Sequence, residues 1–162
     1  MSHYQNILEE ELLQALQSDI NSGSIRVISE SQQYADLISQ NFPFVGNKID
    51  WSKVPGHTVA QLDWRKGYMH AEKSIEKLEY IDAIFSFFDN ILRKTHTPDV
   101  TDLIVLGDGT MDIALQLPAG ILRKHLLDVV ELPQHTYIIP PDVSWCLTYT
   151  TEGYMDFGFR PD

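Results

Sequence analysis

The chain has 162 residues, and 43% of them are hydrophobic, so it is long enough to bury a core and to fold as one domain without a disulfide or a metal. Its 12 Lys and Arg residues stand against 23 Asp and Glu residues, which gives a net charge of -11. A field of that sign repels phosphate backbones and anionic membranes, so we expect neither nucleic acid nor a membrane as a partner.

The single cysteine, Cys146, excludes an internal disulfide and is typical of a reducing compartment. Its neighbours on the expected strand, Ser144 and Thr148, supply neither a base nor a positive charge, so we expect an inert thiol. No apolar stretch reaches the ~18 residues of a membrane span, and the first residues are acidic and amphipathic rather than a basic leader. The sequence therefore predicts a cytoplasmic protein.

The N-terminal part of the chain predicts a helix, a strand and a second helix. Apolar residues recur at helical spacing over residues 4–16, and residues 19–23 are expected to end that helix. Residues 24–28 are short and β-branched, which predicts a strand. The stretch Ser29-Glu30-Ser31-Gln32 then offers an N-cap, Ser29, with Gln three residues on, for a helix whose apolar face includes Tyr34.

The middle of the chain predicts a loop, a strand and the longest helix. Residues 41–56 contain two prolines and two glycines without a clean period, so we expect a loop, followed by a strand over residues 58–62. A broad apolar stripe predicts a helix over residues 66–94. The apolar stretch at residues 85–88 favours burial between the sheet and other helices, and the alternative is a contact between two copies in a homodimer.

After Pro118, apolar residues at helical spacing over residues 121–130 predict another amphipathic helix, which Leu132 and Pro133 would end. Residues 136–139 are β-branched and aromatic and predict a strand that stops at the following prolines.

Two similar phrases predict two C-terminal hairpins. Residues 108–115 and 152–159 each begin with an acidic residue and Gly, continue with Met-Asp, and follow a β-rich run. For the first hairpin, a two-residue turn at Asp108 and Gly109 would place one apolar set on one face, namely Ile104, Leu106, Met111, Ile113 and Leu115.

The register of the last hairpin follows from the same reasoning. A three-residue loop at residues 151–153, with Gly153 in the left-handed conformation, separates apolar from polar side chains. The apolar face would hold Trp145, Leu147, Tyr149, Met155, Phe157 and Phe159. The opposite face would hold Ser144, Cys146, Thr148, Thr150, Tyr154, Asp156 and Gly158. Both Asp112 and Asp156 would then point away from the core.

The order of elements predicts an α+β fold, because helices and strands occur in runs rather than in strict alternation. We expect a mostly antiparallel sheet of about five to six strands, including the two C-terminal hairpins, packed on one face against amphipathic helices. No linker or low-complexity stretch divides the chain, so residues 1–162 are expected to form a single domain.

The sequence lacks most of the motifs that indicate catalysis, nucleotide binding or metal binding. The chain has no phosphate-binding loop motif, no nucleophile elbow, no zinc-binding His-Glu-x-x-His and no paired cysteines. Its six histidines are far apart in sequence, so a metal site would need assembly by the fold, for instance from His135 with Asp112 or Asp156. We weigh those two aspartates as an acid and base pair, but favour two solvated side chains. No catalytic residue, metal or cofactor is predicted.

Aromatic residues gather in or beside the irregular middle segment. Trp51, Trp64 and Tyr68 are of the types that dominate protein interfaces. The same residues could instead fill a small core beneath a long loop, and the two readings stay open.

The C-terminal third resembles small bacterial proteins. The stretches at residues 131–137, 144–146 and 152–158 are similar to those of small stand-alone proteins, some of which resemble the immunity proteins of toxin–immunity systems. That resemblance implies a cytoplasmic acidic inhibitor that covers a basic site on a toxin domain, with acidic residues speeding association.

Two hypotheses of different class follow. The first is a non-enzymatic protein-binding module, most concretely the immunity-type inhibitor that the resemblance implies. Its partner-binding residues are Asp112, Glu152, Tyr154, Asp156 and Trp64. The second is a small-molecule-binding protein or small enzyme with a pocket between the sheet and the helices, lined by aromatic residues and His135.

Overall fold

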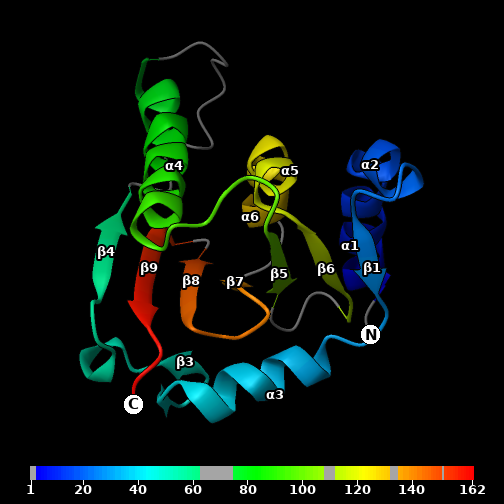
Figure 1. Ribbon diagram of the computed structural model, residues 1–162. Coiled ribbons are helices and arrows are strands. Elements are labelled where there is room, and N and C mark those ends of the chain that lie inside the picture. The colour runs from blue at the N-terminus through cyan, green and yellow to red at the C-terminus, as the bar shows by residue number, and fades with distance from the viewer. Residues whose placement is uncertain (1–2, 63–74, 108–111, 132–134, 151) are drawn as a thin grey trace.

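The computed structural model describes residues 3–62, 75–107, 112–131, 135–150 and 152–162. Its helices are α1 His3–Ala15, α2 Gln17–Asn21, α3 Gln32–Asn41, the 3-10 helix η1 Trp51–Lys53, α4 Ile75–Lys94, α5 Ala119–Lys124 and α6 Leu126–Glu131. Its strands are β1 Arg26–Ile28, β2 Phe44–Val45, β3 Lys48–Ile49, β4 Thr58–Gln61, β5 Asp102–Gly107, β6 Ala114–Pro118, β7 His135–Ile139, β8 Trp145–Thr150 and β9 Tyr154–Phe159. Figure 1 shows them in place.

Seven strands form one antiparallel sheet in the order β1-β6-β5-β7-β8-β9-β4, and β2 and β3 form a separate small hairpin. The fold is therefore α+β, as the sequence predicts. The two edge strands of the large sheet, β1 and β4, both come from the N-terminal half of the chain. The sheet has more strands than the expected five to six, and the β2–β3 hairpin lies in the segment expected to be a loop.

The predicted register of the last hairpin is confirmed. Tyr149 lies opposite Met155, and Thr148 lies opposite Asp156. Gly153, in the loop between the strands, has a φ of 92°, which favours glycine. The predicted apolar face packs into the large core on the α4 side of the sheet, with Phe159 only partly buried at its margin.

The predicted register of the first hairpin is wrong. Val105 lies opposite Leu115, and Leu106 lies opposite Ala114. Leu115 therefore shares a face with Val105, whereas Ile104 and Leu106 lie on the other face. Apolar side chains on both faces of β5 carry no period-two signal, so sequence patterning could not fix the register. The expected turn at residues 108–109 and Met111 lie outside the described residues.

Both faces of the sheet are covered, contrary to the expectation of one. In Figure 1, α4, α5 and α6 lie above the sheet, and α3 lies below it. The large core contains side chains of α1, α4, α5 and α6 against the upper face. A small core lies below, where α3, β3 and the segment around η1 cover part of the lower face. It includes Ile38, Phe42, Ile49, Val54, Ile104, Leu106, Tyr137, Ile139 and Cys146.

Burial explains two expected properties. Cys146 is fully buried, and burial raises the pKa of its thiol, so the thiol is inert as expected. Phe88 in the apolar stretch of α4 is fully buried in the large core, whereas Phe85 and Phe87 pack against that core and are only partly buried. The expected burial is therefore confirmed in part. Residues 66–74 of the expected long helix lie outside the described residues.

Two expected helices are interrupted. The N-terminal helix is divided near Leu16 into α1 and α2, and the helix after Pro118 is divided at His125 into α5 and α6. Asp19 lies inside α2, which ends at Asn21 within the stretch expected to end the helix. Oδ2 of Asp19 accepts hydrogen bonds from Nε2 of His125 (2.6 Å) and Nζ of Lys124 (3.0 Å). The two interruptions therefore meet at one buried carboxylate.

The N-cap expected for the second helix also differs from the structure. Ser31 occupies the cap position of α3 without a side-chain capping bond, and its backbone N–H donates to the carbonyl of Asp112 (2.9 Å).

Among the described residues, no helix is both long and apolar enough to cross a membrane.

Candidate functional site

The lower face of the sheet is apolar at one end of β7, β8 and β9 and polar at the other. At the apolar end, Cys146 lies opposite Gly158, where a Cβ atom would come within 2.2 Å of Cγ1 of Val54. That contact shows how closely the segment around η1 is packed on the sheet. The segment around η1 covers the sheet only as far as this contact. Further along β7, β8 and β9, the residues of the lower face line a pocket instead.

The polar end consists of two cross-strand rows. One row pairs His135 with Thr150 on the neighbouring strand. The next row runs across three strands, because Thr148 lies opposite both Tyr137 and Asp156. Directly opposed residues in an antiparallel sheet bring their side chains together on one face. These rows therefore form a polar floor.

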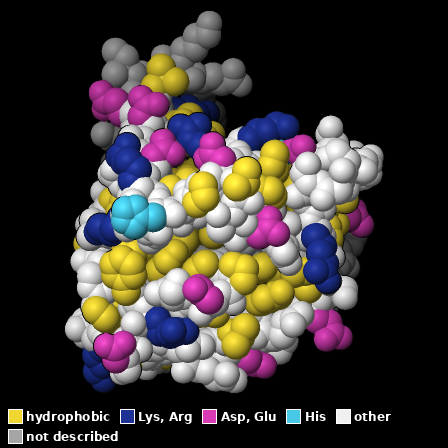
Figure 2. Space-filling model, in the orientation of Figure 1, with side chains coloured by type: hydrophobic (Ala, Val, Ile, Leu, Met, Phe, Trp, Pro, Cys, Tyr) yellow, Lys and Arg dark blue, Asp and Glu magenta, His cyan; other side chains and the backbone are white. Residues whose placement is uncertain are grey.

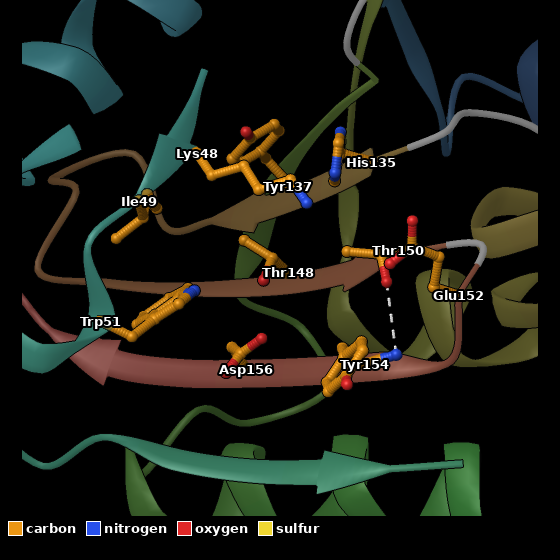
Figure 3. Close-up of a pocket in the computed structure, with 10 residues that line it drawn as sticks. All are labelled: Lys48, Ile49, Trp51, His135, Tyr137, Thr148, Thr150, Glu152, Tyr154 and Asp156. Atoms are coloured by element: carbon orange, nitrogen blue, oxygen red, sulfur yellow. Dashed lines mark hydrogen bonds between the residues drawn. The ribbon is translucent and has the colours of Figure 1, made fainter. Parts of the chain in front are cut away.

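A pocket of about 140 Å³ lies on this floor, and we call it the Thr148 pocket (Figure 3). Its floor is formed by His135, Tyr137, Thr148, Thr150, Tyr154 and Asp156. Its rim is formed by Lys48 and Ile49 of β3, Trp51 of η1 and Glu152 of the β8–β9 loop. The β2–β3 hairpin and η1 form one side of the rim, and the β8–β9 loop forms the other.

Asp156 is fixed by contacts at one end of the pocket. Its Oδ1 lies 2.7 Å from Nε2 of His57, and the His57 ring stacks on Trp51 with 5.2 Å between ring centroids. Trp51 begins η1, which is capped by Asp50. The backbone N–H and hydroxyl of Ser52 donate to the Asp50 carboxylate, and these bonds lower the pKa of Asp50. The sequence around η1 thus positions the Trp51 ring and, through His57, the Asp156 carboxylate.

Tyr154 is held at the opposite end. Nε2 of Gln61 donates to the Tyr154 hydroxyl oxygen (2.9 Å), and the backbone N–H of Tyr154 donates to the Thr150 hydroxyl (3.3 Å). The phenolic O–H of Tyr154 remains available as a donor. The ring is 37% exposed, which is high for a tyrosine on a sheet.

Four polar groups of the pocket make no hydrogen bond or ion pair with another described residue. They are the Thr148 hydroxyl, the Glu152 carboxylate, Oδ2 of Asp156 and the Lys48 ammonium. Thr148 is the exceptional one because the residue is only 6% exposed. The pocket therefore presents charged groups of both signs and one neutral donor and acceptor, none of which is paired with a described residue.

The structure brings together most of the residues that the sequence singled out. Glu152, Tyr154 and Asp156 of the protein-binding hypothesis line the Thr148 pocket together with His135 of the alternative. Asp112 lies apart, in the loop between β5 and β6 rather than on a strand. Trp64 lies outside the described residues.

Asp112 lines a neighbouring cleft of about 490 Å³ between α3 and the sheet, which we call the α3 cleft. The two hollows adjoin at Tyr137, which lines both. The backbone N–H of Asp112 donates to Oε1 of Glu9 (3.0 Å), so this loop is tied to α1 as well as to α3. Asp112 and Asp156 therefore belong to different hollows of the same face.

Sequence reasoning missed the contributions of Lys48, His57 and Thr148. The outward position of Thr148 did follow from the predicted hairpin register, but its burial did not. Lys48 and His57 belong to segments that reach the site only because the β2–β3 hairpin and η1 fold back over the sheet. Trp51 was singled out by its residue type, and the structure places it on the rim of the pocket.

Other parts of the described molecule offer less. No group of three or more potential metal ligands occurs among the described residues. On the side shown in Figure 2, apolar side chains form a band, and acidic and basic side chains are mixed around it. That side presents no patch of a single sign.

The chain matches no protein-family model, and no curated protein matches it.

Proposed function

We propose that the protein is a non-enzymatic protein-binding module that inhibits a basic protein through the face around the Thr148 pocket. The observation that carries this proposal is the pair of carboxylates beside Tyr154. The Glu152 carboxylate and Oδ2 of Asp156 have no partner among the described residues and flank an exposed aromatic ring. Tyr at the centre of a polar rim is typical of interface hot spots.

Exposed apolar side chains around the pocket support the same reading. Val45, which pairs with Lys48, is 65% exposed, and Val59, which pairs with Asp156, is 54% exposed. Apolar residues next to unpaired charges are a common composition of protein interfaces. The net charge of -11 would speed association with a basic partner.

The resemblance of the C-terminal third to immunity-type proteins makes a basic toxin domain the most concrete partner, and a cytoplasmic location belongs to the same proposal. Catalysis is not part of it. The partner would contact Glu152, Tyr154 and Asp156 directly, with Asp112 at the edge of the contact in the α3 cleft.

The test is recovery of partners by the tagged protein from its native host, at low and at high salt. We expect one basic protein that is retained at low salt and lost at high salt, because surface charges are screened as ionic strength rises. Glu152→Lys should abolish the recovery. Glu79→Lys, which makes the same charge change on the exposed side of α4, should preserve it. Equal recovery by both variants would refute the proposed face.

A second candidate function is small-molecule binding, and one observation favours it. Thr148 is only 6% exposed, and its hydroxyl faces the pocket without a hydrogen bond to a described residue. A polar group presented to a pocket in this way can fix the orientation of a small ligand.

A further inference from the structure

We propose that the Thr148 pocket binds a small zwitterion, a molecule that carries an ammonium group and a carboxylate a few bonds apart, as a free α-amino acid does. This inference does not rest on the protein-binding function. It rests on the size of the pocket, on a Thr148 hydroxyl that faces the pocket without a protein partner, and on side chains of opposite charge that line the same pocket.

The first observation concerns the Thr148 hydroxyl. Thr148 is only 6% exposed, it lines the pocket, and its hydroxyl makes no hydrogen bond to any described residue. Figure 3 shows this oxygen and the Asp156 carboxylate on neighbouring strands, facing the same space. No hydrogen bond joins them, so a donor from a ligand can lie between the two oxygens.

The acidic side of the pocket favours an ammonium group. Oδ1 of Asp156 is occupied by His57 at 2.7 Å, which fixes the carboxylate and leaves Oδ2 for a ligand. The Glu152 carboxylate on the β8–β9 loop adds a second negative charge without an ion-pair partner among the described residues. An ammonium group has three donors, which suit Oδ2 of Asp156 and the Thr148 hydroxyl, while Glu152 adds negative charge from the other end of the pocket.

The basic side favours a carboxylate. Figure 3 shows the Lys48 side chain projecting from β3 on the side of the pocket that carries Tyr137, with Asp156 on β9 beyond Thr148. No acidic side chain of the described residues pairs with Lys48. Lys48 is exposed and lines the same pocket as Asp156 without pairing with it, so its ammonium group is available to a carboxylate of a ligand. Lys48 also weighs against a purely cationic ligand, because it would repel one.

The size of the pocket limits the ligand. A cavity of about 150 Å³ holds one benzene molecule, which has six heavy atoms. The Thr148 pocket, at about 140 Å³, therefore fits a ligand of the size of glycine, alanine or serine. The side chain of a larger amino acid would extend beyond the pocket, into solvent or toward the α3 cleft, which shares Tyr137 with it.

The experiment is an NMR titration of the full chain with three probes: glycine, methylammonium and acetate. The amide signals of residues 148, 154 and 156 report binding. We expect saturable shifts with glycine, and at least about tenfold weaker binding of each singly charged probe, since each loses one charged contact. Glycine that binds no more tightly than methylammonium or acetate would overturn the proposal, and so would shifts that do not saturate.

Three variants assign the contacts. Thr148→Val should weaken glycine binding about tenfold, because it removes one hydrogen bond to a charged group while keeping the side-chain volume. Lys48→Met should remove the preference of the pocket for glycine over methylammonium. Asp156→Asn should remove its preference for glycine over acetate.

Two matched controls separate binding from general damage. Thr58→Val makes the same change on β4, where the hydroxyl has no partner among the described residues and belongs to the opposite face of the sheet. Lys53→Met makes the same charge change on η1, outside the pocket. Both should bind glycine as the wild type does, with unchanged far-UV circular dichroism in all variants. A control that weakens binding as much as its matched variant would overturn the assignment.

The two proposals can fail separately. Glycine binding without any basic partner would leave the zwitterion site standing and refute the inhibitor function. A basic partner whose binding depends on Glu152, together with no glycine binding, would do the reverse.

Discussion

Gly158 is the residue on which the closeness of η1 to the sheet depends. A Cβ atom there would lie 2.2 Å from Cγ1 of Val54 and 3.3 Å from a ring carbon of Trp51. We predict that Gly158→Ala destabilises the protein by about 1–3 kcal/mol, as overpacking of a filled core does. Urea unfolding followed by circular dichroism measures the loss.

The cause of that loss can be checked by removing the clashing methyl groups. Val54→Ala should also destabilise the protein, because Val54 is buried in the small core. The double variant should lose less than the sum of the two single losses, since each change relieves the other. Additive losses would show that the Gly158 contact is not the cause.

At the level of single residues, the sequence identified several that line the pocket. Glu152, Tyr154 and Asp156 were found because a confirmed hairpin register placed them on the outer face or in its loop. Thr148 was assigned to the same face, but its burial depends on neighbouring strands and on η1, which no local pattern reveals. Asp112 was misplaced because it lies in a loop whose length the pattern did not give.

Between elements, Asp19 joins α2 to the interruption between α5 and α6. The hydrogen bond from His125 is the main cause that lowers the pKa of Asp19, and Lys124 adds to it. A carboxyl with a lowered folded-state pKa contributes stability above its ordinary value of 3.8, and this stability is lost as the pH falls through the lower folded-state value. We predict that Asp19→Asn lowers the thermal midpoint at neutral pH.

The pH dependence makes that prediction specific. The difference between the wild type and Asp19→Asn should shrink as the pH falls below 3.8, where the carboxylate of the wild type becomes protonated. Asp128→Asn is the control, because Asp128 is more exposed and lies 3.8 Å from Nδ1 of His125. It should have the smaller effect. A difference that persists unchanged at low pH would contradict the role of the charge.

The elements show where sequence patterning succeeds. The last hairpin has one apolar and one mostly polar face, so alternation fixed its register. The strand β5 is apolar on both faces, so the alternation of apolar and polar residues gave no information about its register, and the predicted register was wrong. The β2 and β3 strands have two residues each, too few for any period. The helix interruptions near Leu16 and His125 coincide with a tertiary contact that the helical pattern does not encode.

For the whole molecule, the α+β class followed from the order of elements, but the coverage of the sheet did not. The segment from α3 to η1 covers only part of the lower face, and the Thr148 pocket lies where this cover ends. Its rim and its floor come from residues about one hundred positions apart in the sequence, such as Lys48 and Asp156. That approach results from the fold as a whole, which is why the site could be predicted only in part.

The central claim is that the face around the Thr148 pocket is the binding surface. The most direct test is amide hydrogen exchange of the protein alone and in complex with its basic partner. We predict added protection over residues 44–51 and 152–156, with little change in α4 and α5 on the other side of the sheet. Protection confined to α4 and α5 would contradict the claim.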